Sequence, residues 1–409
     1  MFTNNLLKDE KNAFCSMKHD RIPVMLIAIM FLTIGVMFCM NDILLPIVKD
    51  LYQLSYLQAT FIQISFYIVY IIWPVLITAS VEKYGYRKNI IASMFICIAG
   101  CLFFVPSYFL QSYALVLLGV FTISTGVTVV NVAANPYAAL LGTADGAHVR
   151  LNFVQAFSRI GYAATPLVAS LLIFAHGKNS PMIHTPFLVL ALMISVVVIL
   201  MFVFRMPDHT PSASEKISVM KMFSKSRSHR NLFLGIPTMF FYVGAEACTA
   251  GFFISYITEL GYTTQTAAAF LTFYYILAAV FALVGTLLLR IIKAGTLLGF
   301  AGTGMSLCYV LVIWGPPTAA PYVLMAMGGF LSIMFPTVFG LAIEGLKEFT
   351  AKGSALLNFA IVGGAVFPPL QGLIADAANI RLSYLIPGIC ILVVTAYGFS
   401  IRRADLIKS

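Results

Sequence analysis

The feature that most constrains the fold of this chain is a series of long apolar runs, each long enough to cross a membrane as a helix. A bilayer core requires about 20 apolar residues for one helical span. Twelve runs meet this requirement, at 22–47, 56–80, 90–107, 111–141, 150–174, 186–204, 232–258, 265–290, 294–314, 318–345, 353–375 and 382–400. The runs are continuous and do not alternate with the two-residue period of a barrel strand, so they predict helices.

Composition supports the same class. Hydrophobic residues make up 60% of the chain and charged residues 10%, whereas a soluble domain is about half apolar and a quarter charged. The sequence therefore predicts an all-α membrane protein with twelve transmembrane helices in two six-helix halves. The expected divisions are an N-terminal tail at 1–21, a first bundle at 22–204, a basic connector at 205–231, a second bundle at 232–400 and a C-terminal tail at 401–409.

Lysine and arginine are distributed unevenly between the two ends of the predicted spans. Of the 25 such residues, 21 lie in the tails, in the connector and in loops on the same side, whereas the opposite loops hold Lys49, Lys178 and Arg381. Cytoplasmic loops carry the excess of positive charge in membrane proteins. We therefore expect a multi-pass protein of the plasma membrane, which in a bacterium is the inner membrane, with both termini cytoplasmic.

The net charge of +10 is explained by this asymmetry and by the anionic lipids of the inner leaflet. No basic run is interleaved with aromatic residues, so the lipid bilayer is an expected partner and nucleic acid is not.

Helix-breaking residues occur at matching places in the two halves. Pro136 in the fourth span corresponds to Pro336 in the tenth, and Gly161 in the fifth span corresponds to Gly363 in the eleventh, each followed by a proline five residues later. Repeat-built transporters have bent helices of this kind around a site near the bilayer midplane.

Two acids and one arginine lie within the apolar runs and away from their ends. Asp42 stands in the first span and Glu246 in the seventh. A charged side chain at the centre of a bilayer costs at least about 2.5–3.5 kcal/mol, which favours a functional role. The alternative for Asp42 is that the first span ends early and leaves it at the interface. Arg159 in the fifth span either pairs with one of these acids or binds an anionic solute.

Polar side chains also share helix faces. Gln63, Tyr67 and Tyr70 are spaced to lie on one face of the second span, where they could contact a sugar or pack against a neighbouring helix. Asn152 and Gln155 share a face with Arg159, and Tyr242 shares one with Glu246 by the same spacing.

Motifs for enzymatic chemistry are missing from the sequence. It has no H-E-x-x-H, no G-x-S-x-G and no P-loop, and its seven cysteines show no metal-binding spacing. We therefore expect neither an enzyme nor a metal or cofactor site. An ion gradient would drive transport, with a cation as the coupling partner.

Several motifs resemble the L-fucose–proton symporter family and its glucose/galactose branch, within the major facilitator superfamily. They are NDILLP (41–46), AANPY (133–137), LLG (140–142), RLN (150–152) followed by Gln155, and FYVGAE (241–246). The loop between the second and third spans resembles the cytoplasmic signature of that superfamily. Its matching residues are Glu82, Gly85, Arg87 and Lys88, which we expect to act in gating.

The resemblance implies a major facilitator fold and a role for Asp42 in proton coupling. The glutamate of the family's fourth span falls on Asn131, which cannot exchange a proton at physiological pH, while Glu246 supplies an acid from the other half. We expect Asp42 and Glu246 to bind the coupling cation. The candidate solute-binding residues are Asn41, Gln63, Tyr67, Asn131, Asn135, Asn152, Gln155, Arg159, Tyr242 and Asn358.

These features lead to one functional hypothesis with one alternative. The leading hypothesis is a monomeric secondary transporter, a symporter that couples a proton or sodium ion to the movement of a small polar solute, a monosaccharide, by alternating access. The alternative keeps the fold and transports an anionic solute, such as a sugar acid or hydroxycarboxylate, in either direction, with Arg159 as the anion ligand.

Overall fold

The predicted spans are helical in the computed structural model, which describes residues 21–141, 147–174, 182–204, 206, 230–289, 291–346 and 350–408. Within those residues eleven helices are long and apolar enough to cross a membrane. The remaining predicted span contains a shorter apolar helix, Tyr56–Ile72. The all-α membrane class is therefore confirmed.

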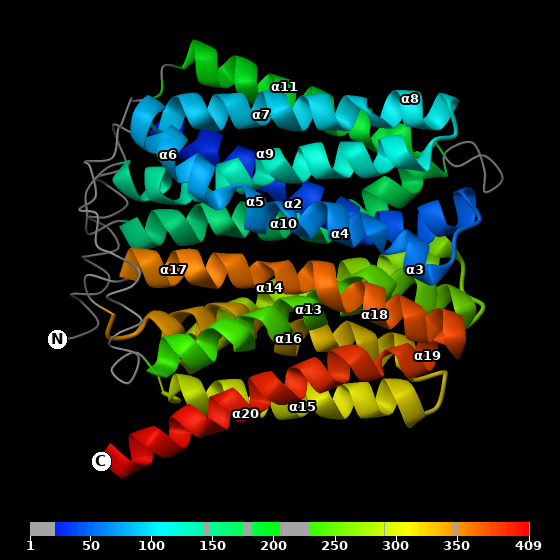
Figure 1. Ribbon diagram of the computed structural model, residues 1–409, viewed down its shortest axis with the longest axis vertical. Coiled ribbons are helices and arrows are strands. Elements are labelled where there is room, and N and C mark those ends of the chain that lie inside the picture. Colours follow the sequence, from blue (N-terminus) through cyan, green and yellow to red (C-terminus); the bar gives the residue numbers. More distant parts are fainter. Residues whose placement is uncertain are drawn as a thin grey trace. The chain divides into compact units, whose positions relative to one another are not determined.

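The first half of the chain supplies the helices labelled α2 to α11 in Figure 1. They are α2 (Arg21–Leu51), α3 (Tyr56–Ala59), α4 (Phe61–Tyr67), α5 (Val69–Ile72), α6 (Pro74–Tyr84), α7 (Tyr86–Leu102), α8 (Phe104–Phe109), α9 (Tyr113–Leu140), α10 (Ala147–Ile173) and α11 (His184–Val203). The second span is thus interrupted where α3 to α6 meet. One cause is Pro74, which lacks a backbone N–H to continue the ladder of helical hydrogen bonds.

The second half supplies the helices labelled α13 to α20 (Figure 1). They are α13 (Arg230–Glu259), α14 (Thr264–Leu288), α15 (Ala294–Trp314), α16 (Ala320–Ile343), α17 (Thr350–Phe359), the 3-10 turn η4 (Ala360–Val362), α18 (Gly363–Ala377), α19 (Ile380–Ser383) and α20 (Leu385–Lys408). The tighter turn of η4 divides the eleventh span in two. Glycines and prolines at this division, Gly363, Gly364, Pro368 and Pro369, explain why the α-helix does not continue without a break.

The chain forms two compact units whose boundaries cross three spans. Among the described residues, unit 1 contains α2 up to Cys39, the chain from Ile72 to Thr165, and α11. Unit 2 contains Met40–Ile71, the end of α10 and the helices of the second half. The last part of the first span and the first part of the second span therefore pack with the second half. The division into two halves at the connector stays a prediction.

Unit 1 is built around the close packing of α7 on α9. Gly126 of α9 allows this approach, because a Cβ atom there would lie 2.3 Å from the Sγ atom of Cys97. The α11 helix packs on the same α7.

Unit 2 is built around α13, which lies among α14, α16, α18 and α20 (Figure 1). Every residue from Tyr242 to Ile257 is buried except Glu246. A helix that is covered on all sides belongs in the centre of a bundle. Glu246 is therefore carried by a helix whose second half is buried on nearly all sides.

Matching glycines make matching contacts in the two units. A Cβ atom on Gly161 of α10 would lie 2.3 Å from the carbonyl oxygen of Leu32 in the first span. A Cβ atom on Gly363 of α18 would lie 1.9 Å from the carbonyl oxygen of Phe240 in the seventh span. The fifth span thus touches the first in the same manner as the eleventh touches the seventh, which agrees with the predicted internal repeat.

Candidate functional site

The centre of the candidate site is Asp42, a buried carboxylate in unit 2. Its side chain is only 6% exposed, and it lies nine residues before Leu51, the last residue of α2. The first span therefore does not end before Asp42. The hydroxyl of Tyr275, on α14, donates a hydrogen bond of 2.8 Å to Oδ2 of Asp42. A hydrogen bond to a carboxylate is among the stronger ones in proteins, so the carboxylate is held toward α14.

Beside Asp42 lies a pair of buried carboxamides. Nδ2 of Asn41 donates to Oε1 of Gln63 on α4 at 2.5 Å, and the two side chains are 3% and 0% exposed. Within the described part of the chain, Oδ1 of Asn41 and Nε2 of Gln63 are buried without a hydrogen-bond partner. The pair thus retains one acceptor and one donor. Exchanging the amide oxygen and nitrogen at both residues would again leave one of each.

Tyrosine rings surround these polar groups. The ring of Tyr67 lies against Gly364 of α18, where a Cβ atom would be 2.6 Å from the ring. The carboxylates of Asp42 and Glu246 are near enough to repel each other electrostatically. Both also interact electrostatically with the hydroxyls of Tyr67 and Tyr274. Unit 2 therefore brings both predicted cation-coupling residues into one polar cluster, with Asp42 buried and Glu246 half-buried.

Two further predicted solute-binding residues also belong to unit 2. Tyr242 is buried, and its hydroxyl donates to the carbonyl of Leu331 at 3.2 Å. In this state the hydroxyl therefore serves helix packing. Asn358 lies half-buried on α17.

The other predicted solute-binding residues lie in unit 1. Nε2 of Gln155 on α10 donates to Oδ1 of Asn135 on α9 at 3.1 Å, and Nδ2 of Asn135 donates to the carbonyl of Asn131 at 3.2 Å. These contacts join α9 and α10 through a row of amides. Arg159 is half-buried on α10, so its pairing with an acid of unit 2 stays a prediction. The side chain of Asn152 lies outside the described residues.

Comparison with known proteins identifies the family. The family model of the Major Facilitator Superfamily matches residues 27–362. The chain belongs to the major facilitator superfamily. Its helical spans are those of a transporter of this superfamily, and it is not an enzyme.

Relatives within the superfamily resemble the chain over nearly its full length. It is 32% identical to a glucose/galactose transporter of Brucella abortus, over 97% of each chain. It is 29% identical to the L-fucose-proton symporter of Escherichia coli, over 92% of each chain. Among solved structures, FucP, a major facilitator superfamily transporter in the outward conformation, matches with a TM-score of 0.68 and 26% identity, over 92% of this chain and 97% of that one.

The predicted gating loop of this superfamily member has a defined conformation. Its four residues lie at the junction of α6 and α7, namely Glu82, Gly85, Arg87 and Lys88. Gly85 has φ +80° and ψ 170°, a conformation that residues with a Cβ atom rarely adopt. Nδ2 of Asn89 donates to the carbonyls of Ser80 and Gly85, and the hydroxyl of Ser80 donates back to Oδ1 of Asn89. These bonds hold the loop between the second and third spans.

Sequence reasoning missed two residues that the structure places at functional or structural centres. Tyr275, next to Tyr274 in the eighth span, is not among the candidates from the sequence, yet its hydroxyl binds Asp42. Arg150 is one of the 21 basic residues on the predicted cytoplasmic side and is not a candidate from the sequence, yet it is 2% exposed, and its Nε donates to the carbonyl of Ala138 near the end of α9. The tyrosine pair within an apolar run was a usable signal for Tyr275. No local pattern separated Arg150 from the other basic residues of its side.

Proposed function

We propose that this superfamily member is a proton-coupled symporter of a monosaccharide that works by alternating access. The observation that carries the proposal is the cluster of buried Asp42, Asn41 and Gln63 with half-buried Tyr275, in helices that are mostly apolar. Uncompensated polar groups inside a membrane protein are costly and mark solute or ion pathways. The relatives named for glucose, galactose and L-fucose support a sugar as the solute.

The carboxamide pair is suited to a sugar hydroxyl. A hydroxyl group donates one hydrogen bond and accepts others. It can donate to Oδ1 of Asn41 or accept from Nε2 of Gln63, a donor that also interacts with the Asp42 carboxylate. The ring of Tyr67, on the same α4 helix, offers an apolar face for the C–H groups of a pyranose ring. A site that leaves buried polar atoms unpaired when a hydroxyl is missing discriminates strongly against deoxy analogues.

The acids are suited to proton coupling. Two nearby carboxylates away from bulk water repel each other, so binding one proton to the Asp42 and Glu246 pair relieves that repulsion. Solute and proton binding are then linked through one charge balance, and each favours the other. The E. coli relative is named as a proton symporter, and no relative named above indicates sodium. We therefore assign the proton as the coupling ion.

The remaining parts of the proposal concern placement in the cell. The positive-inside distribution supports cytoplasmic termini and a cytoplasmic connector in a plasma membrane. By this orientation, the end of unit 2 where α13 and α18 finish faces outward. We propose a monomer as the transporting unit, since each chain carries both halves of the fold.

The experiment that tests the proposal is uptake by the purified protein in proteoliposomes. Labelled glucose, galactose, L-fucose and galacturonate are offered with an imposed proton gradient, with that gradient collapsed by a protonophore, and with a sodium gradient alone. Accumulation of a neutral sugar should require the proton gradient only. Accumulation of galacturonate alone, or dependence on sodium, would overturn the assignment.

Variants of the two acids separate coupling from binding. Asp42→Asn and Glu246→Gln should lose proton-driven accumulation and retain sugar exchange across vesicles loaded with the same sugar. Asp50→Asn is the matched control, because Asp50 is an exposed carboxylate on the same α2 helix. Unaltered proton dependence in both acid variants would contradict their role.

A further inference from the structure

The start of the second span is tied to the eleventh span by a carboxylate. Oδ1 of Asp376, on α18, accepts a hydrogen bond of 2.7 Å from the backbone N–H of Tyr56, and Oδ2 accepts one of 2.8 Å from that of Leu57. These N–H groups belong to the first turn of α3, where the helix itself offers no acceptors. Ser55 and Gln58 close a capping box over the remaining donors. The first turn of α3 is thus completed only by an acid from the other half of the chain.

The side chain of Tyr56 extends this attachment to the seventh span. Its hydroxyl donates to Oε1 of Glu259 on α13, and its ring stacks on Phe252 at 5.7 Å between centroids. Nζ of Lys49, near the end of α2, lies 4.3 Å from the centroid of the same ring. We call the group of Tyr56, Leu57, Asp376 and Glu259 the latch.

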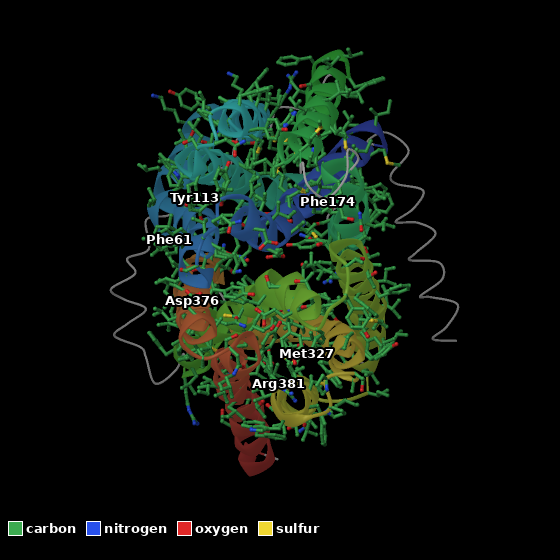
Figure 2. The ribbon with its side chains drawn as sticks, turned by 90° about the vertical axis from the view of Figure 1, so that its right-hand side faces the viewer. Phe61, Tyr113, Phe174, Met327, Asp376 and Arg381 are labelled. Atoms are coloured by element: carbon green, nitrogen blue, oxygen red, sulfur yellow. The ribbon has the colours of Figure 1, made fainter. Side chains whose placement is uncertain are left out.

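Beyond the latch along the second span, that span lies against three glycines, Gly372 and Gly364 of α18 and Gly251 of α13, which we call the glycine row. Cβ atoms on Gly372 and Gly364 of α18 would lie 3.0 Å from the Cα atom of Leu57 and 2.6 Å from the ring of Tyr67. A Cβ atom on Gly251 of α13 would lie 2.8 Å from Nε2 of Gln63. Figure 2 shows Phe61 of α4 and Asp376 on the neighbouring helices of this contact. Glycines allow close approach without interlocking side chains, so such a contact can separate and re-form.

The latch can open without stranding a charge in lipid. Asp376 and Glu259 are both exposed in the structure, so water can solvate each carboxylate when its hydrogen bonds break. The segment Met40–Ile71 also has boundaries at which it could move. It joins unit 1 at Met40 and at Ile71. Just after Ile71, the helical span is interrupted at Trp73 and Pro74.

We propose that the latch is the outer gate of the transport cycle and that Asp376 is its positioning residue. With the latch formed, Met40–Ile71 lies on α13 and α18, and its part at Tyr56 and Leu57 closes the outer side of the site that Asp42, Asn41 and Gln63 of the same segment line. With the latch broken, this segment leaves the glycine row and the site opens outward. That the latch lies on the outer side rests on the orientation given under the proposed function. The hydrogen bonds of the latch do not depend on that orientation.

The test measures how readily the gate opens, by labelling a buried cysteine. Leu45→Cys is introduced into a variant lacking the seven native cysteines. Leu45 is 0% exposed, and its Cδ1 atom lies 3.6 Å from the position of a Cβ atom on Gly251. Intact cells are treated with a membrane-impermeant maleimide, and the labelling rate is measured. Adding Asp376→Ala should raise this rate about tenfold, because two charge-assisted hydrogen bonds are lost.

Three further variants make the result specific. Tyr56→Phe removes only the bond to Glu259 and should raise labelling by a smaller factor of about three. Gly372→Leu places a side chain where the backbone of Leu57 lies and should raise labelling as much as Asp376→Ala. Asp50→Asn, an exposed acid at the same end of the unit, should leave the rate unchanged. If Asp376→Ala does not yield folded protein, Tyr56→Phe and Gly372→Leu decide the question.

Unchanged labelling in the latch variants would overturn the proposal, and so would an increase seen only with reagent added to the cytoplasmic face. The readout needs no sugar and no proton gradient. A failure of sugar uptake would therefore count against the proposed function and leave the latch standing.

Discussion

The contact between Tyr275 and Asp42 permits a quantitative prediction about proton coupling. Tyr275→Phe removes one hydroxyl and keeps the ring, so it deletes the 2.8 Å hydrogen bond to Oδ2 of Asp42 with little change in packing. The hydroxyl donates to the carboxylate, and its loss therefore disfavours the ionised form relative to the protonated form. The variant should bind the coupling proton more readily than the parent.

The size of the effect follows from the kind of bond. Hydrogen bonds to charged groups contribute about 1.5–3 kcal/mol, and a change of about 1.4 kcal/mol corresponds to one pH unit. Because water or a neighbouring group can replace part of the lost bond, the lower end applies. The external pH that gives half-maximal sugar uptake should therefore rise by about one unit in Tyr275→Phe.

The assay is initial-rate uptake into proteoliposomes over a series of external pH values at a fixed internal pH. Tyr242→Phe is the matched control, since it deletes a tyrosine hydroxyl that donates to the carbonyl of Leu331. The control should keep the parental midpoint. A midpoint for Tyr275→Phe that equals the parental one, or that falls, would refute the assignment of Asp42 as the proton-binding group held by Tyr275.

The remaining predictions concern packing and the fifth span. Gly161→Val should sharply reduce the amount of folded protein, because the new side chain would meet the carbonyl of Leu32. Size-exclusion chromatography measures this amount. The control Gly340→Ala should be tolerated, because no atom lies within 4 Å of the position of the added Cβ atom. Arg150→Leu should lower the midpoint of thermal unfolding by several degrees, because the bond to the Ala138 carbonyl is lost; a parental midpoint would contradict a structural role. Arg159→Lys should leave neutral-sugar uptake largely intact and reduce folded protein if the guanidinium pairs with an acid; selective loss of carboxylate transport would instead favour an anionic solute.

The sequence was sufficient for the fold because membrane spans are local features. Each run of about 20 apolar residues predicts its own helix without knowledge of its neighbours, and all twelve predicted runs are helical in the described residues. The apolar runs do not define the helix ends, since a helix can extend past its apolar run. The first span continues four residues beyond its predicted end at 47, to Leu51.

The site was predictable only in part, because its contacts join distant segments. The burial of Asp42 followed from its position within an apolar run. Its partner Tyr275 is 233 residues away, and the two ends of the latch, Tyr56 and Asp376, are 320 residues apart. No spacing rule connects such pairs without a known arrangement of the helices.

The allocation of Met40–Ile71 to the same unit as the second half was likewise beyond sequence reasoning. A transporter of this kind packs the same segments differently at different stages of its cycle, and one sequence serves every stage. The apolar pattern therefore specifies the spans and leaves open which of them touch in a given state.

The coupling of proton and sugar movement is tested most directly by measuring proton flux itself. Glucose, galactose or L-fucose is added to lightly buffered proteoliposomes at equal internal and external pH, and the external pH is recorded. The proposed symport predicts that the medium becomes more alkaline when a transported sugar is added, that a protonophore abolishes the signal, and that Asp42→Asn shows none. Sugar entry with no change in external pH, or an undiminished signal in Asp42→Asn, would contradict the role given to the buried carboxylate.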